Sequence, residues 1–319
     1  MVFLSEKKIS GKKYFYLMRS IRLPDGSVKT LQKMLSSRPK NLKQAENENK
    51  DFFSRKESEA FAKWALAEYK TDSVFTAKEF EKIEAARVGF KAVKARLTKQ
   101  QLKDCLDRFT ANFTYESNAL EGNSLTLKDV SIIMFDNRAI EGKELREIFE
   151  TRNSRNVIEL IYRKRFDLSK ESIIKIHKML VKDILTPTGY KKVPNFLIGR
   201  SVQTTPPEKV PIEMSELIKW ASENPDKLHP LQLSARLHGK FEKIHPFEDG
   251  NGRVGRFLVN AILVNNGYPP LIVRKTQRQS YLKALEDFDR GYLPNLERFF
   301  LDKFKRTYKN FFGAYVKYL

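Results

Sequence analysis

The sequence is poor in cysteine, glycine, proline and histidine, and each shortage excludes a class of protein. Among 319 residues there is one cysteine, Cys105, so a disulfide framework within the chain is excluded. Beside Leu102 and Leu106 this thiol is expected to be buried and inert. The 14 glycines and 13 prolines are too few for a collagen-like or low-complexity chain. Four histidines without an H-E-x-x-H motif argue against a zinc hydrolase.

Long hydrophobic runs are also missing. No apolar stretch approaches the roughly 18 residues that a membrane span requires. Val2, Phe3 and Leu4 are followed by polar residues rather than by the apolar region of a signal peptide. We therefore expect a cytoplasmic protein without a membrane partner. Hydrophobic residues still make up 41% of the chain, with 23 Phe and 12 Tyr, which is enough for a sizeable core.

Positive charge is abundant and unevenly distributed. Lys and Arg number 60 against 39 Asp and Glu, a net charge of +21. Residues 1–50 hold 12 basic and 4 acidic residues, or +8, and the other 269 residues hold 48 and 35, or +13. Such an excess favours contact with nucleic acid or another acidic surface. Residues 1–50 are the candidate region for nucleic acid.

Strand formers are concentrated near the N-terminus and helical patterns follow. Residues 12–19 and 27–31 flank a Pro-Asp-Gly turn and predict a small β-hairpin or meander. The polar stretch 36–50 reads as a linker. Helical spacing of apolar residues begins near residue 57, and Thr126 with Asp129 predicts a helix start. The repeat Glu141, Glu144, Glu147 and Glu150 indicates a solvated helix face rather than a metal site. Prolines and glycines between 186 and 211 predict an exposed hairpin or flap. The fold class is mainly α, with a β-rich appendage.

Most of the chemistry lies in the segment from His245 to Arg256. Pro246 ends the preceding helix at His245. Gly250 and Gly252 allow backbone amides to converge on an anion, and the next helix begins at the same loop. Arg253 and Arg256, three residues apart, fit a polyphosphate. Asp249 offers a hard oxygen ligand for Mg²⁺.

Two nucleotide-binding motifs can be excluded. Gly250, Gly252 and Gly255 formally satisfy G-x-G-x-x-G, but a helix precedes them and the residues about 20 positions later are basic. The Rossmann reading therefore fails. No G-x-x-x-x-G-K-[ST] sequence occurs, which excludes a P-loop.

Residues 245–256 match the motif H-P-F-x-[DE]-G-N-G-R-x-x-R at every position, and the chain thereby resembles the Fic family over approximately residues 100–305. The resemblance implies a Fic-type helical core with a short β-hairpin flap. It also implies transfer of AMP from ATP to a Ser, Thr or Tyr hydroxyl of a target protein, with His245 as general base and Asp249 as the Mg²⁺ ligand. The implied nucleotide-binding residues are Asp249, Gly250, Asn251, Gly252, Arg253, Val254, Gly255, Arg256 and Tyr281. Phe247 would fix the loop in the core.

The resemblance also implies the position of a flap and the boundaries of the domains. Ile198, Gly199, Arg200 and Ser201 fall where the family's flap lies over the nucleotide and binds a target segment by strand addition. The implied domains are a basic appendage at 1–45, a helical region at 46–125 and a catalytic core at 126–310, with the Fido domain at about 167–302. For Tyr281 and His238 core packing is an alternative, and Asp289 stands where related proteins often have Asn.

A second motif lies upstream, from Ser117 to Gly122. It matches the family's inhibitory pattern [ST]-x-x-x-E-[GN], although alone this pattern is weak and Gly122 fits a helix C-cap equally well. The resemblance implies that Glu121 pairs with Arg256 and so blocks productive ATP binding. The motif precedes the core, as in the class with an N-terminal inhibitory helix. Removal of AMP by the same site stays open.

Two other functions stay open. The chain could be a nucleic-acid-associated regulator with a basic N-terminal module and a vestigial Fic core. It could also be a Fic enzyme that transfers another nucleotide, such as UMP. The sequence leaves the target protein and any homo-oligomer undefined.

Overall fold

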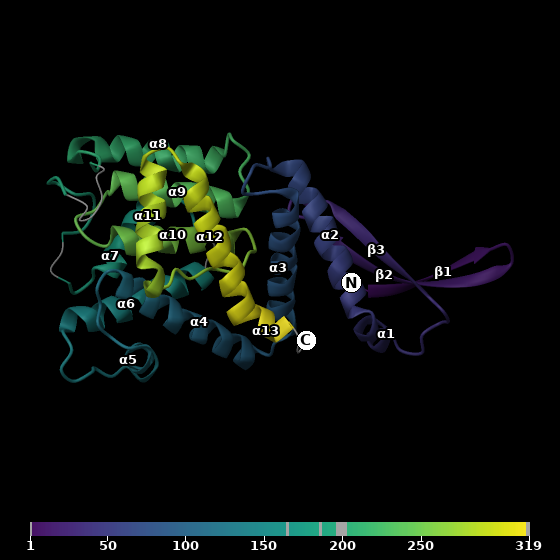
Figure 1. Ribbon diagram of the computed structural model, residues 1–319. Coiled ribbons are helices and arrows are strands. Elements are labelled where there is room, and N and C mark those ends of the chain that lie inside the picture. The colour runs from purple at the N-terminus through teal and green to yellow at the C-terminus, as the bar shows by residue number, and fades with distance from the viewer. Residues whose placement is uncertain (1, 164–165, 185–186, 196–202, 317–319) are drawn as a thin grey trace. The chain divides into compact units, whose positions relative to one another are not determined.

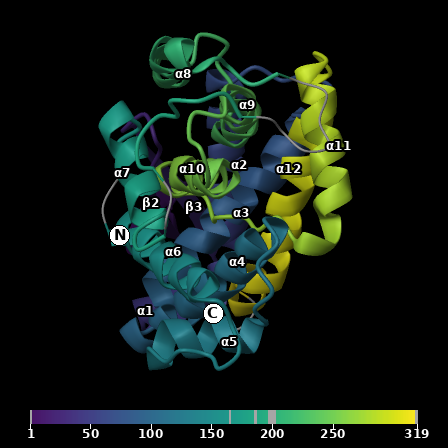
Figure 2. The ribbon, with the colours of Figure 1, turned by 90° about the vertical axis from the view of Figure 1, so that its left-hand side faces the viewer.

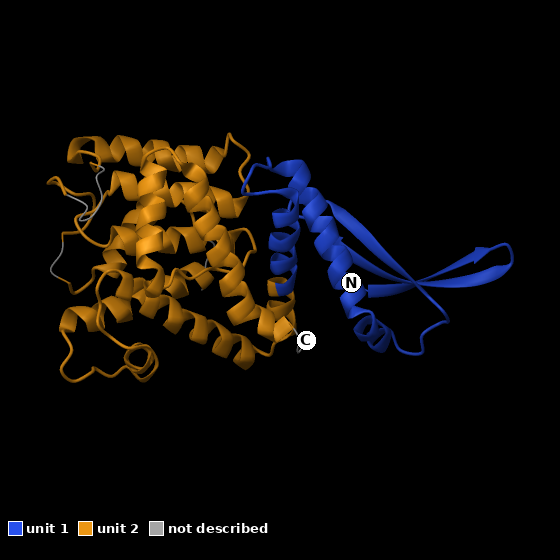
Figure 3. Cartoon of the chain, in the orientation of Figure 1, with its two compact units in different colours: residues 1–89 blue, residues 90–319 orange. Residues whose placement is uncertain are grey.

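The computed structural model describes residues 2–163, 166–184, 187–195 and 203–316. The chain divides into two compact units, residues 1–89 and 90–319 (Figure 3). The described residues are mainly helical, with one three-stranded antiparallel sheet near the N-terminus, so the predicted fold class is confirmed (Figure 1). Within the described ranges no helix is both long and apolar enough to cross a membrane.

The first unit is built around the sheet, which has the order β1-β2-β3. Its strands are β1 (Val2–Ile9), β2 (Lys12–Arg22) and β3 (Val28–Leu35). Leu17 and Ile21 on one face of β2 are buried with Phe53 and Phe61 of α2 (Lys50–Glu68). This alternation of buried and exposed side chains follows from the two-residue period of a strand.

The predicted linker at residues 36–50 is wrong for its second half, which forms the short helix α1 (Leu42–Glu48). Asn41 caps this helix, because its side chain accepts hydrogen bonds from the backbone of Lys43 and Gln44 at 2.9 and 3.2 Å. Ala45 is buried in the same cluster as Leu17. One capping residue and one buried alanine therefore suffice where the sequence shows no apolar period.

The helices of the second unit enclose a large apolar core. Helix α3 (Ala77–Arg96) crosses the division between the units, and Phe90 near its end belongs to this core. Helices α9 (Pro230–Ile244) and α10 (Asn251–Asn265) are packed closely together, with α4 (Lys99–Leu120), α6 (Leu145–Arg163) and α7 (Lys170–Leu180) around α10 (Figure 2). The other elements, in chain order, are α5 (Leu127–Ser131), a π-helix (Ile132–Asp136), a 3₁₀ turn (Pro207–Lys209), α8 (Val210–Glu223), a 3₁₀ turn (Lys275–Gln277), α11 (Arg278–Asp289), α12 (Leu293–Thr307), a π-helix (Tyr308–Phe312) and α13 (Gly313–Val316).

Two local predictions in this unit are confirmed. Thr126 and Asp129 form a capping box at the start of α5. Cys105 is buried, and burial raises the pKa of its thiol to about 11, so it stays protonated and unreactive at neutral pH. The predicted flap residues, from Ile198 to Ser201, lie outside the described residues.

Candidate active site

The turn from α9 to α10 positions His245. Its backbone is left-handed, with φ 52° and ψ 60°, and its N–H still donates to Phe241 O at 2.9 Å, so it ends α9. This conformation agrees with the expectation that Pro246 keeps the preceding residue out of the right-handed helical region. The His245 side chain is 17% exposed, and its Nδ1 lies 3.8 Å from the buried Glu242 carboxylate. The imidazole is therefore accessible, and its Nδ1 edge lies toward a carboxylate.

The loop between the two helices is fixed by its own side chains. Asn251 accepts a hydrogen bond from Phe247 N at 2.9 Å and donates to Phe247 O at 2.8 Å. Phe247 is fully buried and stacks on His177 with ring centroids 3.9 Å apart, which confirms its expected position in the core. Gly250 has φ 80° and is the N-cap of α10. The Asn251 side chain, expected to contact nucleotide, thus shapes the loop.

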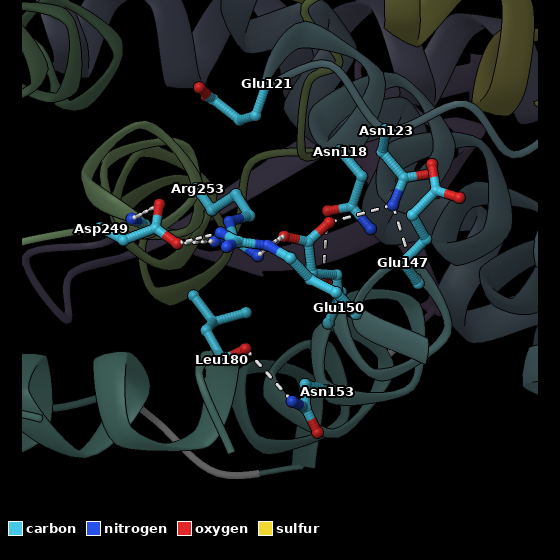
Figure 4. Close-up of polar contacts among 12 residues, drawn as sticks. Asn118, Glu121, Asn123, Glu147, Glu150, Asn153, Leu180, Asp249 and Arg253 are labelled. Atoms are coloured by element: carbon cyan, nitrogen blue, oxygen red, sulfur yellow. Dashed lines mark hydrogen bonds and ion pairs between the residues drawn. The ribbon is translucent and has the colours of Figure 1, made fainter. Parts of the chain in front are cut away.

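Arg253 is buried and pairs with two carboxylates. Its Nη1 lies 3.1 Å from Glu150 Oε1, and its Nη2 lies 3.4 Å from Asp249 Oδ2 (Figure 4). Arg146, one turn before Glu150 on α6, pairs with both Glu150 and Asp249. The four side chains form an alternating charge network between α6 and the α9–α10 turn.

Arg256 is also buried, and its partners come from the end of α4. Its Nε donates to Ser117 Oγ at 3.0 Å and its Nη2 to Ser117 O at 2.9 Å. The same Nη2 lies 2.7 Å from Glu121 Oε1. The Glu121 side chain is 43% exposed, whereas that of Arg256 is 3% exposed. Ser117 and Glu121 of the upstream motif therefore both contact Arg256, the last residue of the motif that begins at His245.

Gly252, Val254 and Gly255 lie in closely packed surroundings. A Cβ on Gly252 would collide with the Glu121 carboxylate, and one on Gly255 would lie 2.7 Å from the His238 ring. Val254 is fully buried. Glycine at 252 thus leaves room for the Glu121 carboxylate beside Arg256.

Tyr281 and His238 lie together in the core of the second unit. Tyr281 is 4% exposed and its hydroxyl is 2.6 Å from His238 Nε2. Burial raises the pKa of Tyr281 well above its usual range, so the hydroxyl stays neutral. One edge of Tyr281 nevertheless lines a cavity of about 140 Å³, together with Glu121, His245, Gly252 and Arg256.

The prediction of a solvated glutamate face is wrong for Glu150. This residue is 7% exposed, pairs with Arg253, and accepts a hydrogen bond from Asn123 Nδ2 at 3.0 Å. The sequence does contain a signal: Glu150, Ser154, Val157 and Ile161 recur at spacings of four, three and four and continue the buried face of α6.

A larger polar cavity of about 520 Å³ adjoins this network. It is lined by residues that directly follow α4, by α6 and the segment before it, and by the motif, including Glu121, Lys143, Arg146, Glu150, Asp249 and Arg253. Within the described ranges, no group of three or more His, Cys, Asp or Glu side chains could hold a metal ion. Mg²⁺ commonly binds one carboxylate together with phosphate oxygens and water, so Asp249, whose side chain is 35% exposed, fits such a site.

Known proteins resemble this chain around the same site. Residues 167–263 match the Fic/DOC family. The curated Protein adenylyltransferase Fic of Nematostella vectensis is 32% identical over 200 residues, which are 60% of this chain and 46% of that protein. Its namesake from Drosophila melanogaster is 30% identical over 198 residues, 60% of this chain and 40% of that protein. The chain therefore spans less than half the length of these curated relatives.

Solved structures agree with the sequence match. A Fic domain-containing signaling protein from Bacteroides thetaiotaomicron superposes with a TM-score of 0.66 at 27% identity, over 74% of this chain and 96% of that one. Fic-1 from C. elegans has a similar fold, with a TM-score of 0.65 at 23% identity, over 74% of this chain and 71% of that one. Residues 167–263 of this chain thus match the Fic/DOC family, and the complete motif lies within the matched residues, across the α9–α10 turn and the start of α10.

Proposed function

We propose that this protein is an autoinhibited adenylyltransferase that moves AMP from ATP to a Ser, Thr or Tyr hydroxyl of a target protein or of itself. The observation that carries the proposal is the cavity of about 140 Å³ that the partly exposed His245 lines together with the buried Arg256. The name shared by the curated relatives, Protein adenylyltransferase Fic, supports the same reaction.

His245 acts as the general base. The target oxygen attacks the α-phosphorus of ATP, the bond from that phosphorus to the β-phosphate bridging oxygen breaks, and pyrophosphate leaves. The hydroxyl proton passes to Nε2 of His245, because Nδ1 lies toward Glu242. The remaining catalytic contribution is positioning and charge stabilisation.

The phosphates are bound by the start of α10. Backbone amides from Gly250 to Gly252 and the helix N-terminus favour anions, and Arg253 and Arg256 add positive charge. Asp249 would be the protein ligand of Mg²⁺, which when bound offsets the phosphate charge. Tyr281 would contact the base, and residues 198–201 would contact the target. We also propose the domain boundaries expected from the sequence: a basic appendage at residues 1–45, a helical region at 46–125 and a catalytic core at 126–310.

Glu121 inhibits the enzyme by pairing with Arg256. The 2.7 Å ion pair supports this, since a guanidinium bound to Glu121 is not available to the γ-phosphate. Ser117 accepts from the same side chain and contributes to its position. Because Glu121 is partly exposed, it can leave the pair without opening the core.

The test compares three full-length proteins with Mg²⁺ and ATP labelled at the α-phosphorus. We expect Glu121→Gly to incorporate at least about tenfold more label than wild type, which corresponds to about 1.4 kcal/mol. Glu121→Gly combined with His245→Ala should incorporate none, and mass spectrometry should find an AMP adduct. Equal labelling of wild type and Glu121→Gly would refute the inhibitory role.

Three further measurements test other chemistry at the same site. Label transferred from the γ-phosphorus instead would indicate phosphate transfer rather than AMP transfer. Competition by UTP, with a UMP adduct in the intact mass, would favour the alternative nucleotide. Loss of adduct after pyrophosphate and ATP are removed, in wild type only, would assign removal of AMP to Glu121.

A further inference from the structure

The end of the β1–β2 hairpin has no part in the proposed transfer reaction. β3 pairs with β2 only from Phe15 to Arg22, so residues 12–14 of β2 pair with β1 alone. The buried cluster of the first unit contains Val2, Leu17 and Ile21 but no residue from 3 to 16. Figure 1 shows this end of the hairpin running past β3 and α2. It is a two-stranded ribbon without core support.

Lysines are concentrated on this ribbon. Lys7, Lys8, Lys12 and Lys13 are all exposed, and Glu6 is the one acidic residue from 6 to 13, which gives a net charge of +3. By register, Lys7 and Lys12 lie on one face with Tyr14 and Tyr16, and Lys8 and Lys13 lie on the other. Both faces of the ribbon therefore present positive charge.

The ribbon is not optimised for its own stability. Lys8 and Lys13 are direct cross-strand partners, an arrangement of like charges that destabilises a hairpin. The ion pair of Lys13 with Glu6, at 2.7 Å, offsets only part of it. Two-stranded ribbons are at best marginally stable on their own. A polyanion around the tip would relieve the repulsion, which indicates a ligand rather than a structural purpose.

We propose that the tip of the β1–β2 hairpin binds double-stranded DNA by entering the major groove. Four residue steps separate Phe15 from the turn at Gly11, a length of about 13 Å. The major groove of B-DNA is about 12 Å wide and 8.5 Å deep and admits a two-stranded ribbon. The deep, narrow major groove of A-form RNA does not. Lysines on both faces then reach the phosphates on both sides of the groove.

The full-length chain tests this by fluorescence anisotropy with a labelled DNA duplex over a range of salt concentrations. Replacing Lys7, Lys8, Lys12 and Lys13 with Ala should weaken binding at least about tenfold at ~50 mM salt and reduce the slope of log K against log salt by up to about 3.6, or 0.9 per lost phosphate contact. The matched control replaces four exposed lysines outside the hairpin, Lys63, Lys70, Lys78 and Lys128, which removes the same charge.

The control variant distinguishes a DNA-binding site at the hairpin tip from nonspecific attraction of DNA to a positively charged protein. Equal losses in the tip variant and the control would refute the site, and unchanged binding by the tip variant would do the same. Tighter binding of duplex RNA or of single-stranded DNA than of duplex DNA would refute entry into the major groove. Replacing the four tip lysines with Arg should restore binding, which shows that the Ala variant fails through charge rather than through misfolding. AMP transfer by the tip variant should equal wild type.

Discussion

Arg253 and Arg256 differ in the exposure of their partners although both are buried. Glu150, which pairs with Arg253, has a side chain that is 10% exposed, whereas Glu121, which pairs with Arg256, is 43% exposed. A buried charge is stable only when it is paired, because desolvation of an unpaired ion costs several kcal/mol. The Arg253 pair therefore belongs to the permanent structure, and the Arg256 pair can exchange with a ligand.

Replacing Glu150 with Ala should destabilise the protein strongly. Arg253 would be left buried without its main partner, at a cost of about 3 kcal/mol. The measurement is the free energy of unfolding in urea. Glu144→Ala is the matched control, because Glu144 lines the same cavity but is exposed, and it should change stability by less than about 0.5 kcal/mol. Similar values for the two variants would contradict a structural role for Glu150.

If Asp249 binds Mg²⁺ as proposed, Arg146 would compete with the cation for this carboxylate. Its guanidinium pairs with Asp249 Oδ2, an oxygen that a metal ion would need. We expect Arg146→Ala, in the Glu121→Gly background, to lower several-fold the Mg²⁺ concentration at which a non-hydrolysable ATP analogue binds. Direct Mn²⁺ binding by electron paramagnetic resonance gives a readout independent of activity.

The control for Arg146 is Lys143→Ala, which removes one positive charge from the same cavity without touching Asp249. An equal shift in both variants would mean that overall charge, rather than the contact with Asp249, sets the Mg²⁺ requirement.

For single residues, the sequence predicts a role when that role depends on neighbours close in the chain. The motif from His245 to Arg256 can be read without the structure because its chemistry depends on spacing within one turn. Glu150 was missed because its partner, Arg253, is about 100 positions away and nothing in the local sequence shows which carboxylate a guanidinium will meet. The placement of Tyr281 against His238 is equally non-local.

Among the elements, the end of α4 is joined by hydrogen bonds to the 3₁₀ turn before α11 and to the first residue of α11. Glu116 accepts a hydrogen bond from Lys275 N at 2.7 Å, and Arg278 Nε donates to Leu120 O at 3.1 Å. Leu120 immediately precedes Glu121. The position of the Glu121 carboxylate, proposed above to be inhibitory, therefore depends on these two contacts as well as on its own ion pair.

If Glu121 inhibits AMP transfer as proposed, weakening this connection should partly relieve the inhibition. Glu116→Ala removes one hydrogen bond that is worth about 1 kcal/mol, so AMP transfer should rise by up to about fivefold. The same substitution in the Glu121→Gly background should have no effect, because the inhibitory carboxylate is already absent. An equal increase in both backgrounds would show that Glu116 acts on catalysis by another route.

The elements themselves were predictable to different degrees. Apolar spacing predicts long helices such as α4, because burial along one face leaves a period of three and four residues. The strands of the sheet are marked by aromatic and β-branched residues. Helix α1 was missed because it has seven residues and depends on one cap, which is too little to produce a period.

For the whole molecule, the two units have separate apolar clusters. One contains Leu17, Phe53 and Phe61, and the other contains Phe113, Phe241 and Phe257 with many further side chains. The candidate site lies entirely in the second unit, and its central loop, from His245 to Gly250, joins the two closely packed helices α9 and α10. Damage to this loop should therefore affect the stability of residues 90–319 as a whole.

His177 makes that stability depend on pH. Its Nδ1 accepts the N–H of Gly189 at 3.4 Å, and its Nε2 lies 3.1 Å from Asp249 O, a pattern that requires the neutral ring. Burial lowers the pKa of His177 from 6.5 to about 4. The unfolded chain therefore binds a proton that the folded chain does not, between pH 6.5 and pH 4. The stabilisation is complete above pH 6.5 and is lost as the pH falls toward 4, by about 3 kcal/mol in total.

Urea unfolding of wild type and His177→Gln between pH 7.5 and pH 4.5 measures this contribution. Wild type should lose stability steadily below pH 6.5, and the variant, which has no titrating ring at this position, should lose less by about 2 kcal/mol at the lower end. The difference between the two curves isolates His177, because carboxylates titrate in both proteins. Parallel curves would contradict a buried, neutral His177 ring. They would also argue against its contacts with the Phe247 ring and with Asp249 O, which help to fix the loop.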